Sequence, residues 1–341
     1  MRNLSLATVF AAASGFVVMW IASWALDAEL GYGYFLAFWG LFFACTGLID
    51  GITQETTRAV AASRETKVRG TANPWKLGTA IGAALAVVVL AAGVAGMSRI
   101  VPSNPGTATA LLAFGLLSYA FQAVLSGILS GAGLWNRYAA LVALDSGIRL
   151  VLAVVVWALG GGLVHFLAIT VIGALSWVLI LALAPVRVTL DVDRATFVRR
   201  VASAMVASGA SAALITGFPT AASAAFPAAT SGAAVAAINN AVMLTRAPVL
   251  VPLQRFQSAL VVRFVERRSN VYRALAGPVA AILGVGLIGF AAAWAIGPWI
   301  LRVAYKPELF VDGLTLGLLT FASAFMGMLM ITGVAVLALE R

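Results

Sequence analysis

Long apolar stretches are the feature that most constrains this chain. About ten runs of roughly 18 or more mainly apolar residues follow one another along its 341 residues. A helix needs about 20 such residues to cross the hydrocarbon core of a bilayer. Because 62% of the residues are hydrophobic and only 10% are charged, the chain has too few polar side chains to cover a soluble core. We therefore predict an all-α, polytopic membrane protein.

The same apolar runs predict where the membrane-spanning helices lie. Continuous runs rich in Ala, Leu, Val and Gly favour helices over β-barrel strands, which would alternate in polarity over segments of about ten residues. The ten expected spans are Leu4–Leu26, Tyr34–Ile52, Trp75–Met97, Ala108–Ala132, Tyr138–Leu159, Leu163–Ala184, Val201–Phe218, Ser231–Val251, Ala274–Trp299 and Leu314–Ala338.

Basic residues predict the orientation of these spans. Arg and Lys gather before the first span and after spans two, four, six and eight, whereas the other connections hold few of them. Since Lys and Arg are retained on the cytoplasmic side, both termini are expected in the cytoplasm. The net charge of +10 therefore belongs to membrane topology and is no evidence for nucleic acid as a partner. The prevalence of Arg and Ala is typical of a GC-rich bacterial genome, so we expect a multi-pass protein of the bacterial cytoplasmic membrane.

The polar residues offer no catalytic centre. With one His and one Cys, His165 and Cys45, the chain has no pair for a metal site and no base beside a nucleophile. Neither a Walker motif nor a soluble nucleotide-binding domain is present. We expect no enzyme activity, no catalytic residue, no metal and no cofactor.

A polar connector after the sixth span divides the chain. Residues 184–200 contain Pro185, Asp191, Asp193 and four Arg residues. We expect a six-helix N-terminal lobe at residues 1–190 and a four-helix C-terminal lobe at residues 191–341.

Three sequence segments resemble a known family. The first is Leu30-Gly31-Tyr32-Gly33-Tyr34 followed by Thr46-Gly47-Leu48-Ile49-Asp50-Gly51 and Arg58. The second combines Ser126-Gly127-Ile128-Leu129-Ser130-Gly131, Tyr138-Ala139-Ala140 and Arg149-Leu150, and the third is Arg246-Ala247-Pro248. Together they resemble the polysaccharide flippases of the multidrug/oligosaccharidyl-lipid/polysaccharide exporter superfamily.

The resemblance implies two helical lobes around a central cavity and movement of a polyprenyl-diphosphate-linked oligosaccharide or polysaccharide precursor by alternating access. It also implies at least two helices after the tenth span, so the C-terminal lobe is expected to be shortened or truncated. The implied partners are the lipid-linked glycan, membrane lipids, and a glycan polymerase or glycosyltransferases.

Charges inside the spans carry the functional prediction. An Arg or Asp near the bilayer centre costs about 3 kcal/mol on insertion scales, so it usually faces a partner or a wet cavity. Asp145 and Arg149 stand four residues apart in the fifth span and can pair on one helix face. Two interpretations stay open, a buried ion pair that orients the helix, or an Arg149 that exchanges Asp145 for an anionic substrate.

The substrate-binding candidates are polar residues of three spans. Guanidinium groups stay ionised and can donate two parallel hydrogen bonds to a phosphate, which suits a diphosphate. The candidates are Arg58, Arg149 and Arg246 for the diphosphate, and Gln54, Asn239 and Asn240 for the sugar.

Two alternative functions remain. A cation-coupled drug exporter of the same superfamily would need an acidic coupling residue, for which Asp50 and Asp145 are the candidates. The other alternative is a membrane subunit of glycan assembly that transports nothing.

Overall fold

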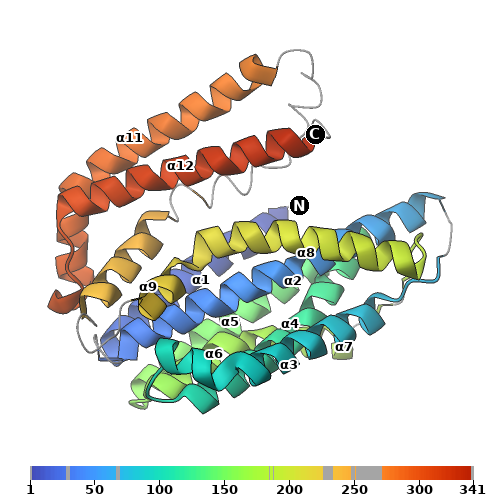
Figure 1. The fold of residues 1–341 in the computed structure, drawn as a ribbon, viewed down its shortest axis with the longest axis horizontal. Coiled ribbons are helices and arrows are strands. Elements are labelled where there is room, and N and C mark those ends of the chain that lie inside the picture. The colour runs from blue at the N-terminus through green and yellow to red at the C-terminus, as the bar shows by residue number, and fades with distance from the viewer. Residues whose placement is uncertain are drawn as a thin grey trace. The chain divides into compact units, whose positions relative to one another are not determined.

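The chain is all-helical in the computed structural model, as predicted (Figure 1). The structure describes residues 2–27, 31–66, 70–183, 185–186, 188–225, 233–246, 250 and 271–338, and none of these lies in a β-strand. The chain forms two compact units, residues 1–232 and residues 233–341. Each unit contains helices that are long and apolar enough to cross a membrane.

The first unit holds the first two thirds of the chain. Its longest helix has 34 residues, more than a bilayer core requires. The helices are α1 (Arg2–Ala25), α2 (Gly33–Thr66), α3 (Pro74–Ile100), α4 (Pro105–Gly131), α5 (Trp135–Ala158), α6 (Leu163–Ile172), the 3-10 turn η2 (Gly173–Leu175), α7 (Ser176–Leu183), α8 (Arg194–Thr216) and α9 (Phe218–Ala225).

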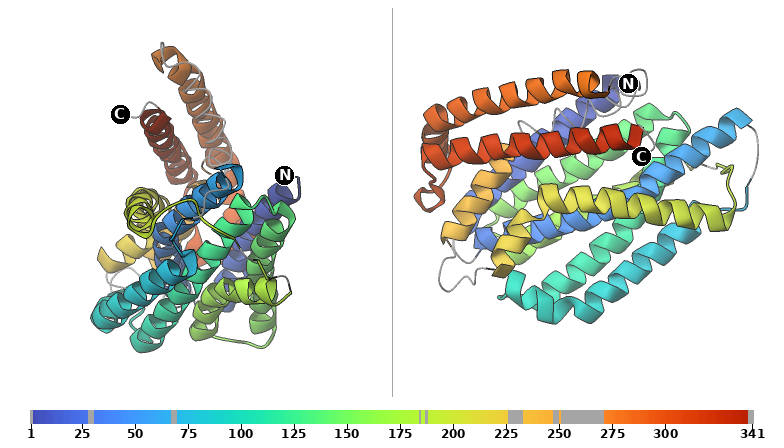
Figure 2. Two further views of the ribbon diagram at one scale, coloured as in Figure 1. Left: turned by 90° about the vertical axis from the view of Figure 1, so that its right-hand side faces the viewer. Right: turned by 45° about the horizontal axis from the view of Figure 1, so that its top comes forward.

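Helix α2 runs through the middle of this unit and packs against α4 and α8 (Figure 2). Small residues allow the close approach. A β-carbon at Gly47 would collide with Ala212 of α8, and one at Gly127 of α4 would collide with Thr56. Helices in lipid associate through such small-residue faces, because lipid leaves no hydrophobic driving force between them. Gly127, Ser130 and Gly131 of the Ser126–Gly131 segment therefore lie on the face of α4 that packs against α2.

The second unit contains a helix at residues 233–246, α11 (Val271–Ala304), the 3-10 turn η4 (Pro307–Leu309) and α12 (Gly313–Ala338). Helices α11 and α12 form an antiparallel pair (Figure 1). Asp312 caps α12, since its carboxylate accepts hydrogen bonds from Thr315 N at 3.0 Å and Thr315 Oγ1 at 2.6 Å.

Most of the predicted spans are helices of the structure. Among the described residues, eight helical segments are long and apolar enough to cross a membrane, or nine if α8 and α9, which are bent by 64°, count as one. That bent pair contains the predicted seventh span. The predicted eighth span begins in the helix at residues 233–246 and otherwise falls largely outside the described residues. The predicted lobe division near residue 190 stays a prediction; the compact units divide at residue 232, because α8 packs on α2.

Three predicted cytoplasmic connections meet at one end of the first unit, which we call the basic end. Gly70 N donates to Leu190 O at 2.6 Å, and Ala72 N donates to Val192 O at 3.2 Å. Arg64 Nη1 donates to Gly131 O at 3.3 Å, which joins the end of α2 to the end of α4. Connections of one predicted side thus lie together, as the positive-inside rule requires. The cytoplasmic position of the termini stays a prediction.

Candidate functional site

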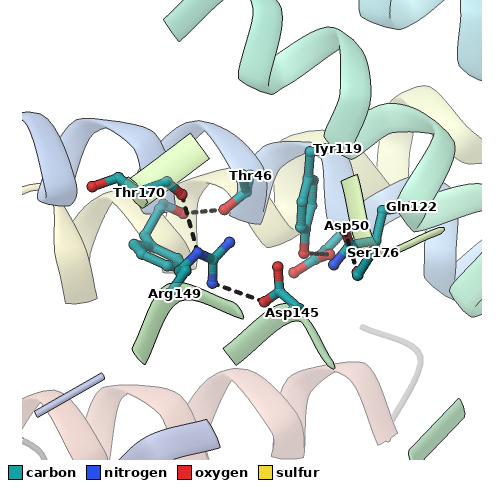
Figure 3. A network of polar contacts seen from close by, with 9 residues as sticks. Thr46, Asp50, Tyr119, Gln122, Asp145, Arg149, Thr170 and Ser176 are labelled. Carbon is teal, nitrogen blue, oxygen red and sulfur yellow. Dashed lines mark hydrogen bonds and ion pairs between the residues drawn. The ribbon is translucent and has the colours of Figure 1, made fainter. Parts of the chain in front are cut away.

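The Asp145–Arg149 pair on α5 is buried inside the first unit (Figure 3). Arg149 Nη1 donates to Asp145 Oδ2 at 2.8 Å, and only 5% of Arg149 is exposed. The helical period of 3.6 residues places both side chains on one face, as predicted. The pairing leaves open both interpretations, structural and substrate-exchanging, because it fits either one.

Other elements enclose the Arg149 guanidinium. Its Nε donates to the backbone carbonyl of Thr170 on α6 at 3.1 Å, and its Cζ lies 5.2 Å from the ring centre of Phe43 on α2. A β-carbon at Gly173, in the 3-10 turn η2, would lie 2.5 Å from Nε and 2.7 Å from Asp145 Oδ1. The turn between α6 and α7 therefore provides the space that this ion pair fills.

A second carboxylate lies next to this pair. Tyr119 Oη on α4 donates to Asp50 Oδ1 on α2 at 2.9 Å. Figure 3 shows Asp50, Tyr119 and Asp145 directed toward one another. The cluster of Asp50, Tyr119, Asp145 and Arg149, which we call the acidic network, holds two carboxyl groups against one guanidinium.

Two charged atoms of the network have unused hydrogen-bonding capacity. Asp145 Oδ1 and Arg149 Nη2 are buried, and neither makes a hydrogen bond to any residue that the structure describes. A buried polar atom without a partner costs about 1–3 kcal/mol, and more when it is charged. The network can therefore take up a proton, a small cation or water at the carboxylate, and the Arg149 Nη2 group can donate hydrogen bonds.

Polar groups of α4 and α7 lie beside the network. Ser176 Oγ donates to Gln122 Oε1 at 3.2 Å, and Trp177 Nε1 donates to Ser118 Oγ at 3.0 Å. Sequence reasoning missed Tyr119 and Gln122. Their signal was present, because Ser118 and Tyr119 stand about one turn before Gln122 in a mainly apolar span.

Arg58 and Gln54 lie further along α2, toward the basic end, and both are exposed. Arg58 Nε donates to Glu55 Oε1 at 2.8 Å, and Arg200 Nη1 lies 3.8 Å from the same carboxylate. The offset of eight residues from Asp50 to Arg58 corresponds to about 12 Å of helix. The structure therefore separates Arg58 from the acidic network, and sequence reasoning missed its partner Glu55.

Asn239, Asn240 and Arg246 belong to the second unit. Both Asn residues are buried, with 0% and 1% exposed, whereas Arg246 is partly buried. Pro248, the last residue of the third resembling segment, lies outside the described residues. Because each unit is described by itself, a common cavity for Arg149 and Arg246 stays a prediction, and so do the substrate roles of all six candidates.

The chain has sequence relatives in mycobacteria. No protein-family model matches the chain. An uncharacterized protein of Mycobacterium bovis is 36% identical over 340 residues, which cover 97% of this chain and 78% of the relative. An uncharacterized protein of Mycobacterium tuberculosis strain H37Rv is 35% identical with the same coverage.

Solved structures share the architecture at low sequence identity. An inward-facing multidrug resistance MATE family transporter of the MOP superfamily superimposes with a TM-score of 0.72 and 17% identity, covering 97% of this chain and 81% of that one. Lipid II flippase MurJ in an inward closed conformation gives 0.66 and 13%, covering 100% and 77%. The chain therefore belongs to the family of these mycobacterial proteins, and its fold is that of the multidrug/oligosaccharidyl-lipid/polysaccharide exporter superfamily.

Proposed function

We propose that the chain is a cation-coupled transporter of the bacterial cytoplasmic membrane that works by alternating access. The observation that carries this proposal is the acidic network, in which Asp50 accepts a hydrogen bond from Tyr119 and Asp145 pairs with Arg149, so that two carboxyl groups lie beside a single guanidinium (Figure 3). Ionisable residues inside a membrane protein commonly form proton or ion pathways. The shared exporter fold supports the same general function.

The coupling step follows from charge balance. With both carboxylates ionised, the network carries one negative charge in excess, which is unfavourable in a region of low dielectric. A proton or small cation bound at Asp50 or at the free Asp145 oxygen removes that charge. Asp50 faces Tyr119 from α4, while Asp145 faces Arg149 within α5. Loading and unloading of the cation would therefore change the charge at the junction of α2, α4 and α5.

For the substrate we propose a polyprenyl-diphosphate-linked oligosaccharide or polysaccharide precursor. Arg246 with the neighbouring Asn239 and Asn240 supports this choice, because a guanidinium can bind the diphosphate and amides can bind the sugar. The fold shared with Lipid II flippase MurJ over the whole chain supports it as well. Arg58 and Gln54 are exposed side chains on α2 that would meet the substrate from the first unit, and a glycan polymerase or glycosyltransferases would supply it.

A second candidate is a cation-coupled drug exporter. The specific observation in its favour is that both acidic coupling candidates, Asp50 and Asp145, lie in one network beside Tyr119. The multidrug resistance MATE family transporter, with a TM-score of 0.72, supports the same alternative.

Transport by the purified chain in liposomes tests coupling and substrate separately. A fluorescent polyprenyl-diphosphate glycan and a cationic dye are compared with and without an imposed proton or sodium gradient. We expect gradient-dependent movement of the glycan lipid, loss of gradient dependence in Asp50→Asn, and normal transport in the exposed control Glu308→Gln. Movement of the dye alone would show that the substrate is a drug and not the glycan lipid. Unchanged gradient dependence in Asp50→Asn would contradict the proposed coupling.

The substrate role of Arg246 has its own test. Arg246→Ala is expected to reach normal membrane abundance and lose glycan-lipid transport, whereas Arg246→Lys recovers part of it, because Lys keeps the charge and loses the bidentate geometry. Full transport by Arg246→Ala at matched abundance would leave Arg246 as a structural residue.

A further inference from the structure

A cavity of about 680 Å³ lies at the basic end of the first unit. Its walls come from the last turns of α2, the turn between α4 and α5, and the connector before α8. It begins at Val60, ten residues beyond Asp50, which is about 15 Å further along α2. The cavity is therefore distinct from the acidic network.

The lining combines hydrogen-bond donors with apolar walls. Arg64 is the one charged side chain among the described lining residues, and the hydroxyl groups of Ser63 and Thr189 lie 3.1 Å apart beside it. Arg64 Nη1 donates to the Gly131 carbonyl at 3.3 Å, which holds the side chain at the cavity and leaves its remaining N–H groups for a ligand. Val60, Leu134 and Val188 form apolar wall. Such a lining suits an anion attached to an apolar body.

The position of the cavity along α2 corresponds to the surface of the membrane. Val60 and Arg64 follow Gly33, the first residue of α2, by 27 and 31 residues. At 1.5 Å per residue they lie about 40–47 Å along the helix. A bilayer including its headgroups is about 40–45 Å thick. A helix that starts at one membrane face therefore carries these residues to the headgroups of the other.

We propose that this cavity binds the phosphate headgroup of an anionic phospholipid of the inner leaflet. Basic pockets between transmembrane helices on the cytoplasmic side are suited to such headgroups, and the negative potential of the leaflet concentrates Lys and Arg there. In the sequence, the basic residues Lys67 and Arg69 follow shortly after Arg64. A further basic residue, Arg187, stands between the lining residues Val186 and Val188. The bound lipid would join α2 to the connector that leads into α8. This site does not depend on which substrate is transported.

Thermal unfolding of the purified full chain in detergent tests the ligand class. The chain is titrated with short-chain phosphatidylglycerol, with short-chain phosphatidylcholine and with inorganic phosphate. We expect phosphatidylglycerol to raise the unfolding temperature, since a ligand that binds only the folded state stabilises it. Equal stabilisation by phosphatidylcholine would overturn the anion site, and equal stabilisation by inorganic phosphate would overturn its assignment to a lipid.

Three variants locate the binding. Arg64→Gln removes the charge and Thr189→Trp fills the cavity from an exposed position while keeping Arg64. Each is expected to raise the midpoint concentration of phosphatidylglycerol about ten-fold or more, a change of about 1.4 kcal/mol in binding. Arg199→Gln removes an exposed charge from α8 outside the cavity and should leave the midpoint unchanged. A wild-type midpoint in Thr189→Trp, or an equal loss in Arg199→Gln, would contradict the proposal, even if Arg64→Gln fails to fold.

Discussion

Two ion pairs of the first unit share their chemistry and differ in their surroundings. Asp145–Arg149 lies inside the helical bundle, with 15% and 6% of the two side chains exposed, and further bonds and rings enclose the guanidinium. Glu55–Arg58 lies toward the basic end, where 43% of the Arg58 side chain but only 11% of the Glu55 side chain is exposed, and where Arg200 offers the carboxylate a second partner. Removing Arg149 leaves the Asp145 carboxylate without its cation, whereas removing Arg58 leaves the Glu55 carboxylate with Arg200 3.8 Å away.

The comparison separates two roles that look alike in the sequence. In both pairs the two residues stand three or four positions apart on one helix, so helical periodicity alone predicts the same pairing for both. A buried pair costs about 3–5 kcal/mol when one partner is removed, whereas an exposed pair contributes about 0–1 kcal/mol. The surroundings therefore decide how much stability is lost when one partner of each pair is removed.

The largest expected effect concerns Arg149. Arg149→Ala leaves the Asp145 carboxylate buried without its partner and should destabilise the chain by about 3 kcal/mol or more. Asp145→Ala combined with Arg149→Ala removes both charges and should restore most of the membrane abundance. Abundance and thermal unfolding in detergent measure both effects. Normal stability of the single variant would show that the pair is not the buried anchor described above.

The double variant also separates the two interpretations of the pair. We expect it to reach normal abundance and still fail to transport, because the acidic network has lost its exchangeable charges. Full transport by the double variant at matched expression would leave Asp145 and Arg149 as structural contacts.

Gly173 tests the space that the buried pair occupies. A β-carbon there would lie 2.5 Å from Arg149 Nε, so Gly173→Ala forces the guanidinium or the α6–α7 turn to move. Overpacking of this kind costs about 1–3 kcal/mol. Gly162→Ala is the matched control at the other end of α6, because no atom lies within 4 Å of the added β-carbon. Equal unfolding temperatures of the two variants would mean that the turn adjusts freely around the pair.

The Glu55–Arg58 pair should show a small effect. Arg58→Ala, Glu55→Ala and the double variant form a cycle whose coupling energy we expect to be at most about 1 kcal/mol, because Arg58 is solvated and Arg200 can replace it. Chemical or thermal unfolding of the four proteins measures the coupling. A coupling as large as that of Asp145 and Arg149 would erase the contrast between the two regions.

The smallest expected effect belongs to Asp193, a fully solvated carboxylate at the start of α8. Its pKa lies below the usual value, because the backbone N–H of Thr196 and other donors of the first turn hydrogen-bond to the charged form. Stability from this cap is present above the unfolded pKa of about 3.9 and is lost as the pH falls through the lower folded value. Asp193→Asn keeps an acceptor and removes the charge.

The unfolding temperature of Asp193→Asn and of the wild type, followed from pH 6 down to pH 3, checks this cap. We expect a small difference at pH 6 that narrows below about pH 4. A difference that grows as the pH falls would show that the charged cap does not stabilise α8.

The amino-acid sequence by itself determined the all-helical membrane fold and the local geometry within each helix. Apolar length is a property of about 20 consecutive residues, so most spans could be predicted without knowing what packs against them. The Asp145–Arg149 pairing is equally local, since 3.6 residues per turn bring positions four apart together. The exporter fold was also within reach of the sequence, through the small-residue segments of α2 and α4.

Only the tertiary structure decided which polar residues form one site. Tyr119 and Asp50 are 69 residues apart, and Thr170 contacts Arg149 across 21 residues. No periodicity encodes these contacts. The first depends on how closely Gly127 allows α4 to approach α2, and the second on the space that Gly173 leaves for the Arg149 guanidinium. Burial likewise arises from neighbouring helices, and it enclosed Arg149 in the bundle while it left Arg58 exposed. The sequence specifies which charges exist, and packing decides which of them lose their water.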